Sequence, residues 1–391
     1  MLRRIAGAAS GLTLILAGTA YAAGPAAARP MAAATPPTVY IANAPLSGNG
    51  SVTPIDSATN TAGPAINVGM DPVDIAVTPD GATAYVANNA DGTVTPIATA
   101  TGTAGPAIPI GTSANAMAIT PDGATAYVVD SADGTVRPID VATQTAGAAI
   151  KVGKEPNAIA ITPNGTTAYV LNRGSGTVTP IDLGSNTPGP AIPVGRNPLA
   201  LAITPNGSTV YVASDEFGTV TPIATATSIV GTAIRVLKNP YDIAITPNGK
   251  KLYVVSMGNG TAKHPGGVTP ISIVHHNQPG KVIKAGRSPE TIAITPNGKT
   301  AYVTSIGAGT SSPGGVTPIT VATNTPGPLI ATGGTPGFLA ITPDGSTVYA
   351  LNVVLSGFLE QSTVTPITVA GNTAGTPIEV GDNPDAIAIT P

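Results

Sequence analysis

The chain has 391 residues, of which only 9% are charged, and its formal net charge is −3. Bulk charge therefore gives no indication of an anionic membrane, and we expect no nucleic-acid partner. With no Cys, the chain offers no disulfide, no thiolate metal site and no cysteine for a lipid anchor. Its 47 Gly and 40 Pro fit a turn-rich all-β chain.

The N-terminus has the pattern of an export signal. Arg3 and Arg4 precede an apolar stretch over residues 5–18, and Ala20-Tyr21-Ala22 supplies a small-x-small cleavage site. A membrane anchor is the alternative, but the apolar run is shorter than the ~20 residues that a span needs. A twin-arginine signal is a further alternative. We expect a secreted protein, in the envelope space or the medium, with no transmembrane segment in the mature chain.

One pattern repeats from about residue 39 to the C-terminus. Each unit holds an Ile-Ala-Ile-Thr run, a Pro-Asp-Gly or Pro-Asn-Gly turn, a Tyr, a Val-x-Pro-Ile tetrad and an Ile-x-Val-Gly segment. The repeated Tyr is found at Tyr40, Tyr85, Tyr127, Tyr169, Tyr211, Tyr253, Tyr302 and Tyr349. A period of 42 to 49 residues with four short β-type runs is typical of a propeller blade, because one unit cannot bury its own faces.

The four runs of each unit predict four strands, which we call a to d. Strand a is the Ile-Ala-Ile-Thr run, strand b carries the Tyr, strand c the tetrad and strand d the Ile-x-Val-Gly. Short turns between them predict an antiparallel meander. We therefore divide the chain into a signal peptide at 1–22, a disordered Ala/Pro-rich leader at 23–37 and an all-β propeller at 38–391.

The two ends of the array predict how the ring closes. The first unit begins at strand b, with Val39-Tyr40-Ile41, and the chain ends on a lone strand a at residues 386–390. Three strands from one end and one from the other complete an eighth blade and remove two exposed sheet edges. We predict eight blades with this one-plus-three closure. The alternative is seven blades with frayed ends.

All eight tetrads contain a Pro in strand c. Because Pro removes a ladder donor, we expect strand c to bulge there or to be bonded on one side only. The Pro residues are Pro54, Pro96, Pro138, Pro180, Pro222, Pro270, Pro318 and Pro366.

The strands Tyr85–Asn88 and Tyr169–Asn172, together with the Asp/Asn-Gly turns, give the chain a family likeness. Over nearly the whole predicted mature chain it resembles the YVTN β-propeller repeat family. The resemblance implies a secreted or surface-layer protein, usually of seven blades, and a fold related to that of propeller lactonases. The repeat count of eight and the Pro in strand c depart from that family's pattern.

Four carboxylates follow the turn Pro at the d–a turns, which lie nearest the axis of a propeller: Asp74, Asp242, Glu290 and Asp385. Carboxylates around one mouth could hold a hard cation or act as acid and base. The alternative is that they are solvated turn residues. His275 and His276 are adjacent and would point to opposite faces of a strand, so they cannot both ligate one metal from a regular strand. We expect them near a c–d turn, in a structural or solvated role. We assign no catalytic residue, no metal ligand and no cofactor.

The repeats differ most in their b–c connections, which are longer in units six, seven, eight and one. These connections should form one arc on the same face as the d–a turns. Unit six contributes Lys263 and His264, and unit eight contributes an apolar loop that includes Phe358 and Leu359. Such apolar residues either fold back onto the blade or form a partner-binding patch.

Charge is segregated along the ring. Residues 137–299 contain fourteen Lys and Arg and seven Asp and Glu, whereas the rest of the ring contains thirteen acids and no base. Either the repeats have drifted, or the ring binds a charged envelope polymer or another protein in one orientation. We expect an exported, non-enzymatic binding or scaffold module. The alternative is a lactonase-like hydrolase or lyase that uses axial carboxylates, with or without a divalent metal.

Overall fold

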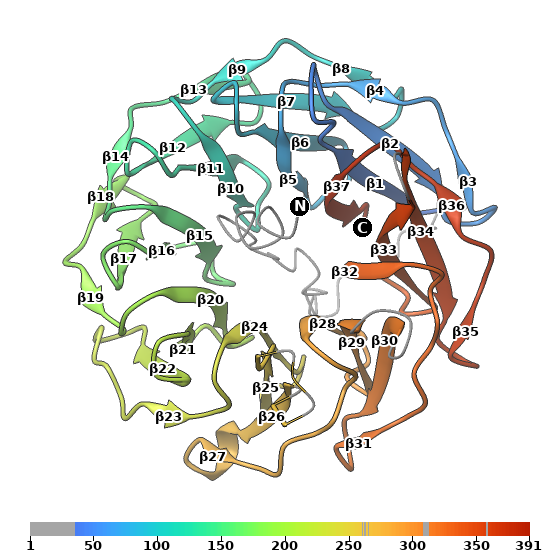
Figure 1. The fold of residues 1–391 in the computed structure, drawn as a ribbon. Helices are drawn as coiled ribbons and strands as arrows, with labels where there is room; N and C mark the ends of the chain where they lie inside the picture. The colour runs from blue at the N-terminus through green and yellow to red at the C-terminus, as the bar shows by residue number, and fades with distance from the viewer. Residues whose placement is uncertain (1–35, 260, 262, 265, 308–312, 357–358) are drawn as a thin grey trace, which may run out of the picture.

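The computed structural model describes residues 36–391 apart from 260, 262, 265, 308–312 and 357–358. Eight antiparallel sheets stand around a central axis, as Figure 1 shows, and each is built from four successive strand positions. The predicted eight-bladed propeller is thus confirmed. Within the described part of the chain, no helix is long and apolar enough to cross a membrane.

Strand positions a, b and c are continuous in every blade. The innermost strands a, from the first blade to the eighth, are β37 (Pro384–Ile389), β5 (Pro72–Val77), β10 (Ala114–Ile119), β15 (Pro156–Ile161), β20 (Pro198–Ile203), β24 (Pro240–Ile245), β28 (Pro289–Ile294) and β32 (Thr335–Ile341). Strands b are β1 (Thr38–Asn43), β6 (Thr83–Asn88), β11 (Thr125–Asp130), β16 (Thr167–Asn172), β21 (Thr209–Ser214), β25 (Lys251–Ser256), β29 (Thr300–Gly307) and β33 (Thr347–Ser356). Strands c are β2 (Ser51–Asp56), β7 (Thr93–Ala98), β12 (Thr135–Asp140), β17 (Thr177–Asp182), β22 (Thr219–Ala224), β26 (Gly267–Ser272), β30 (Pro313–Thr320) and β34 (Leu359–Thr368).

The outer strand d consists of short pieces. They are β3 (Thr61–Ala62), β4 (Ile66–Asn67), β8 (Thr103–Ala104), β9 (Ile108–Pro109), β13 (Thr145–Ala146), β14 (Ile150–Lys151), β18 (Thr187–Pro188), β19 (Ile192–Pro193), β23 (Ile234–Arg235), β27 (Gln278–Pro279), β31 (Thr325–Pro326), β35 (Thr373–Ala374) and β36 (Ile378–Glu379). A 3₁₀ turn, η1 (Ile273–His275), precedes β27 in the c–d connection of the sixth blade, so His275 lies where the sequence predicts it.

The ring closes inside the first blade. Strand β37, drawn red in Figure 1, pairs antiparallel with the blue β1, from Val39 opposite Ile389 to Ala42 opposite Ala386. The Thr390 N–H also donates to the Thr38 carbonyl at 3.0 Å. The predicted one-plus-three closure is confirmed.

The Pro of strand c causes no bulge against strand b. The register of β1 with β2 runs unbroken through Tyr40 opposite Pro54. Strand d is interrupted instead: β3 and β4 pair with either end of β2, and between them the Gly63 N–H donates to the Pro54 carbonyl at 2.8 Å. Since the N–H and C=O of a strand residue point the same way, the missing Pro donor faces this gap and costs the b–c ladder nothing. Of the two predicted outcomes the bulge is wrong, and bonding of the Pro residue on one side only is confirmed.

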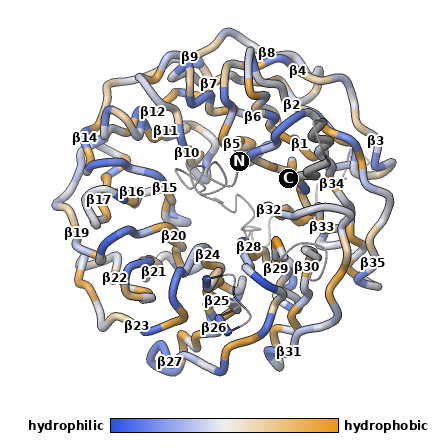
Figure 2. Tube along the Cα trace, in the orientation of Figure 1, coloured by the Kyte–Doolittle hydropathy of each residue, from blue (hydrophilic) through white to orange (hydrophobic). Residues whose placement is uncertain are grey.

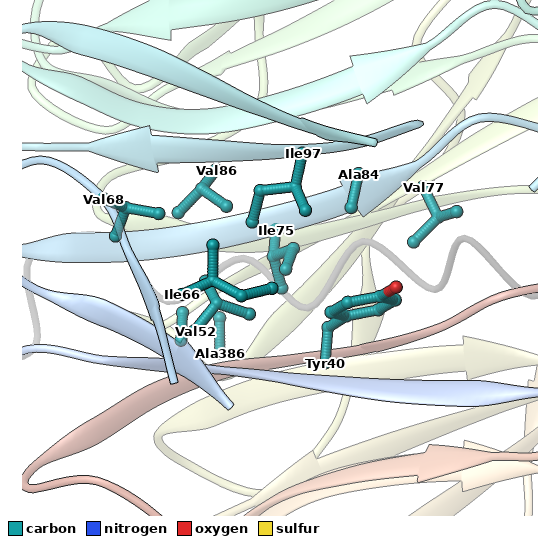
Figure 3. Close-up of a cluster of buried hydrophobic side chains, with 11 residues drawn as sticks. Tyr40, Val52, Ile66, Val68, Ile75, Val77, Ala84, Val86, Ile97 and Ala386 are labelled. Carbon is teal, nitrogen blue, oxygen red and sulfur yellow. The ribbon is translucent and has the colours of Figure 1, made fainter. Parts of the chain in front are cut away.

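The hydrophobic core lies between blades. Figure 3 shows one such cluster, in which Tyr40 and Val52 of the first blade meet Ile75, Val86 and Ile97 of the second. The repeated Tyr is at most 2% exposed in all eight blades. Burying each large apolar side chain contributes about 1.5–3 kcal/mol, so neighbouring blades stabilise one another.

The hydroxyl of the repeated Tyr reaches the c–d turn of the next blade. Tyr127 Oη donates to Asn186 Oδ1 at 2.7 Å, and Asn186 has a left-handed backbone with φ 53°. We call this contact the Tyr–Asn bridge. It recurs as Tyr211–Asn277, Tyr253–Asn324, Tyr302–Asn372 and Tyr349–Asn60, at 2.6–2.7 Å. The last of these joins the eighth blade to the first.

The Asn at the end of strand b leaves room only for Gly at the end of the preceding blade's strand d. Asn88 Nδ2 donates to Thr95 Oγ1 at 2.9 Å. A Cβ placed on Gly69, at the end of the preceding blade's strand d, would lie 2.6 Å from Asn88 Cγ, so only Gly fits. Where the fifth blade meets the sixth, Leu237 replaces the Gly and Ser256 replaces the Asn. Thr269 Oγ1, in strand c of the sixth blade, is buried without a hydrogen-bond partner.

Candidate binding face and axial carboxylates

The d–a and b–c turns lie on one face of the ring, which we call the d–a face. Hydrogen bonds join the two kinds of turn within a blade. In the fourth blade the Arg173 N–H donates to the Glu155 carbonyl at 3.0 Å, and in the fifth the Asp215 N–H donates to the Asn197 carbonyl at 3.1 Å. Glu155 and Asn197 have left-handed φ values of 48° and 50°. This arrangement presents both turns of each blade to the same side, as the sequence predicts.

Asp74 and Asp242 are part of the framework between blades. The N–H groups of Met117, in the next blade, and of Ile75 donate to Asp74 at 2.8 and 2.9 Å. Asp242 accepts in the same way from Ile292 of the next blade at 2.9 Å and from Ile243 at 2.8 Å. Burial raises the pKa of both carboxyls to about 7, against the opposing effect of these N–H donors. Asp242 is buried and Asp74 is partly exposed, and both carboxyls are held by backbone N–H groups. They are not close together, because they lie four blades apart on opposite sides of the ring.

Glu290 and Asp385 lie where strand a departs from regular pairing, directly after the turn Pro. Burial raises the pKa of Glu290 to about 7. Burial and the nearby Asp71 raise that of Asp385 to about 7. Burial, then Glu290 and Asp242, raise the pKa of Tyr241, with Arg173 opposing. Among the described residues, no three His, Asp or Glu side chains are grouped so that they could hold a metal ion. The four predicted carboxylates therefore do not converge on one site.

The longer b–c connections differ from the predicted loops. In the seventh and eighth blades the added residues extend strands b and c, as β29–β30 and β33–β34. Leu359 begins β34, opposite Ser356, and Phe358 lies outside the described residues. The loop predicted in the eighth unit is thus replaced by an extension of two paired strands, because the run of β-forming residues continues to Ser356. In the sixth blade Lys263 and His264 are exposed in a turn, where the His264 N–H donates to the Thr261 carbonyl at 3.1 Å.

The positive charge of the ring is concentrated at one repeated turn position. The residue two places before the turn Pro is a cation in four consecutive blades, the fourth to the seventh. We call these residues the cationic arc: Lys154, Arg196, Lys238 and Arg287. The first three are exposed and Arg287 is partly exposed. The same position in the other four blades holds Asp382, Met70, Thr112 and Gly334. Figure 2 shows hydrophilic colour on the connections that lead into β15, β20 and β24.

The sequence alone predicted a basic half of the ring but missed this turn position. The signal was present, since aligning the repeats on the turn Pro places the four cations in one column. What the repeats could not give is that the d–a turn is bonded to the b–c turn, which brings further charged residues to the same surface.

A hollow of about 560 Å³ lies within the cationic arc, between the fourth and fifth blades. Arg173, Arg196, Glu155 and Ser175 are among the residues that line it. Asn197 Oδ1 accepts from Arg173 Nε at 2.8 Å and orients that side chain. Arg196 is 80% exposed and contacts Glu216 across 3.3 Å.

Comparison with known proteins identifies the fold. No family model matches the sequence, and no curated protein matches it. The chain is similar in structure to the dihydro-heme d1 dehydrogenase NirN, with a TM-score of 0.72 and 13% identity over 90% of this chain and 74% of that one. It is also similar to the hydrazine synthase of Kuenenia stuttgartiensis, with a TM-score of 0.61 and 23% identity over 79% and 96% of the two chains. A putative 6-phosphogluconolactonase of Bacteroides fragilis aligns with a TM-score of 0.58 and 14% identity over 93% and 100%. At these identities the comparisons show a propeller fold alone.

Proposed function

We propose that this protein is an exported, non-enzymatic binding or scaffold module that works at the cell envelope or outside the cell, and that it binds an anionic partner through the d–a face. The cationic arc carries the proposal. Exposed charges of this kind contribute little to folding stability, so their repetition at one turn in four neighbouring blades has no structural explanation.

The distribution of charge also supports binding in one orientation. The acidic half of the ring places Asp91, Asp133 and Asp382, all exposed, on the same face but in other blades. A face with one positive and one negative half steers a charged partner and fixes its orientation. Phe358 and Leu359, which follow β33 in the sequence, are proposed as an additional contact of a protein partner.

Polyanion binding at graded salt tests the proposal. Fluorescein-labelled dextran sulfate should bind the wild-type protein, and the dissociation constant should rise steeply with salt concentration. The triple variant Lys154→Ser, Arg196→Ser, Lys238→Ser should lose most of this binding. A control triple variant, Lys250→Ser, Lys281→Ser, Lys299→Ser, removes the same charge outside the d–a face and should bind like the wild type. Equal losses in both variants would show that only net charge matters and would contradict the proposed face.

The hydrolase or lyase alternative has less support. It needs carboxylates that converge on a substrate, whereas Asp74 and Asp242 accept backbone N–H groups on opposite sides of the ring. Glu290 and Asp385 are its remaining candidates. Lactone-hydrolysing activity that is lost in a Glu290→Gln variant but kept in the cationic-arc variant would favour the enzyme over the binding module.

A further inference from the structure

An exposed aromatic residue belongs to a turn that contacts the rim of the hollow in the cationic arc. Phe217, in the b–c turn of the fifth blade, is 65% exposed and is the one aromatic residue among the exposed large hydrophobic residues in the described part of the chain. Its neighbour Glu216 contacts Arg196, which lines the hollow. The turn that holds Phe217 thus contacts a residue that lines the hollow.

The hollow combines two kinds of polar group. Arg173 and Arg196 present guanidinium groups, which suit carboxylates because they can donate two parallel hydrogen bonds. Glu155 lines the same hollow and can only accept hydrogen bonds when ionised. A ligand that fills this site must therefore present an anion to the arginines and a hydroxyl donor to Glu155.

These groups select one class of polyanion. A polyphosphate offers charge but no hydroxyl donor and no apolar face. A sugar ring that carries a carboxylate offers all three, because the C–H groups on one side of the ring form an apolar surface that stacks on an aromatic side chain. The volume of about 560 Å³ lies within the range of small-ligand sites.

We propose that the hollow is a subsite for one acidic sugar of a linear, carboxylated polysaccharide. Arg196 and Arg173 bind the carboxylate, Glu155 accepts from a ring hydroxyl, and Phe217 stacks on the same or the adjacent sugar. Lys154 and Lys238, in the flanking turns, extend the contact along the polymer. This subsite rests on the proposed binding function and specifies the partner of the same face.

Calorimetry with the full protein can separate the possible ligands. The three polyanions to compare, at matched charge, are oligogalacturonate, inorganic polyphosphate and oligo-dT. We expect the oligogalacturonate to bind most tightly. Phe217→Ala should weaken its binding about tenfold, as buried aromatic contacts do at interfaces, and leave polyphosphate binding unchanged. Leu46→Ala removes an 82% exposed apolar side chain from the first blade's b–c connection and serves as the matched control. Glu155→Gln should reduce the preference for oligogalacturonate over polyphosphate.

The outcomes distinguish the two proposals. If no polyanion binds the wild type, both fall. If all three bind alike and Phe217→Ala has no effect, the acidic-sugar subsite is wrong while charge-dependent binding at the d–a face stands. If oligo-dT binds most tightly and depends on Phe217, the ring stacks on bases and the sugar assignment is overturned. Unchanged melting temperatures of the Phe217 and Glu155 variants are required for each comparison, and a variant that melts early is replaced by Phe217→Leu or Glu155→Asp.

Discussion

The Tyr–Asn bridge is missing at three blade interfaces. At two of them Tyr40 and Tyr169 donate to backbone carbonyls instead, at 3.5 Å, and the third allows a sharp prediction. Tyr85 Oη is buried without a hydrogen-bond partner. The residue that corresponds to Asn186 in the next blade is Gln144, and the two share a left-handed φ of 53°. The backbone is thus in place, and only the longer side chain prevents the amide oxygen from meeting the phenol.

We expect Gln144→Asn to stabilise the ring. A net intramolecular hydrogen bond contributes about 0.5–1.5 kcal/mol, and Asn tolerates the left-handed region better than Gln. The gain in the free energy of unfolding should be about 1 kcal/mol, measured by urea denaturation. Tyr85→Phe should be close to neutral in the wild type, since the hydroxyl it removes has no partner, but should cost about 1 kcal/mol in the Gln144→Asn background.

The third blade supplies the matched reference. Tyr127→Phe breaks an existing bridge to Asn186 and should cost about 1 kcal/mol. If Tyr85→Phe costs as much as Tyr127→Phe in the wild type, then the Tyr85 hydroxyl already has a partner and the reasoning fails. A coupling energy near zero between positions 85 and 144 in the double-mutant cycle would also refute it.

Three further predictions concern closure, packing and pH. Deleting residues 385–391 removes the partner of β1 and should produce association by size-exclusion chromatography; a monomer that melts like the parent would contradict the role of the closure strand. Ser256→Asn alone should destabilise the sixth blade, because Leu237 occupies the space that the Asn side chain needs. Combining it with Leu237→Gly should recover about 1 kcal/mol of the free energy of unfolding, because the Asn amide can then donate a hydrogen bond to Thr269 Oγ1; urea denaturation measures this. The folded-state pKa of Asp74 and of Asp242 is raised to about 7 from 3.8, so the native state binds these protons more tightly than the unfolded state does. The melting temperature should therefore rise as pH falls from 8 to 5. The double variant Asp74→Asn, Asp242→Asn should flatten that rise, and an equally steep rise in this variant would contradict the assignment.

The features that the sequence predicts best are those repeated in every unit. The eight Tyr positions gave the blade count, and the offset between a first strand b and a last strand a gave the closure. These inferences succeed because inter-blade packing needs the same residue at the same place in each blade. The outer strand was less predictable: Pro54 could have bulged strand c, and the observed solution depends on Gly63 and a break in strand d.

The candidate site depends on contacts between blades. The sequence of one repeat does not show which groups of the neighbouring blade its residues will meet. Asp74 lies two residues after its turn Pro and accepts the N–H of Met117 in the next blade, whereas Glu290 lies directly after its turn Pro. Asp242 holds the same place as Asp74 and also accepts an N–H from the next blade. The sequence shows these places but not the N–H groups that the neighbouring blade presents to them. The cationic arc was accessible from sequence, because it requires only alignment of Lys154 and its equivalents on the turn Pro.

The closure of the ring also has a mechanical consequence. Thr38 and Ile389 lie at the same end of the β1–β37 ladder, since Val39 is opposite Ile389 and the strands are antiparallel. Tension applied to the segments beyond these two residues would therefore peel the ladder open one hydrogen bond at a time instead of loading all of its bonds in parallel. A tether at either terminus alone leaves the ring unstressed, whereas a pull between the two termini meets its weakest direction and would open the first blade before any other.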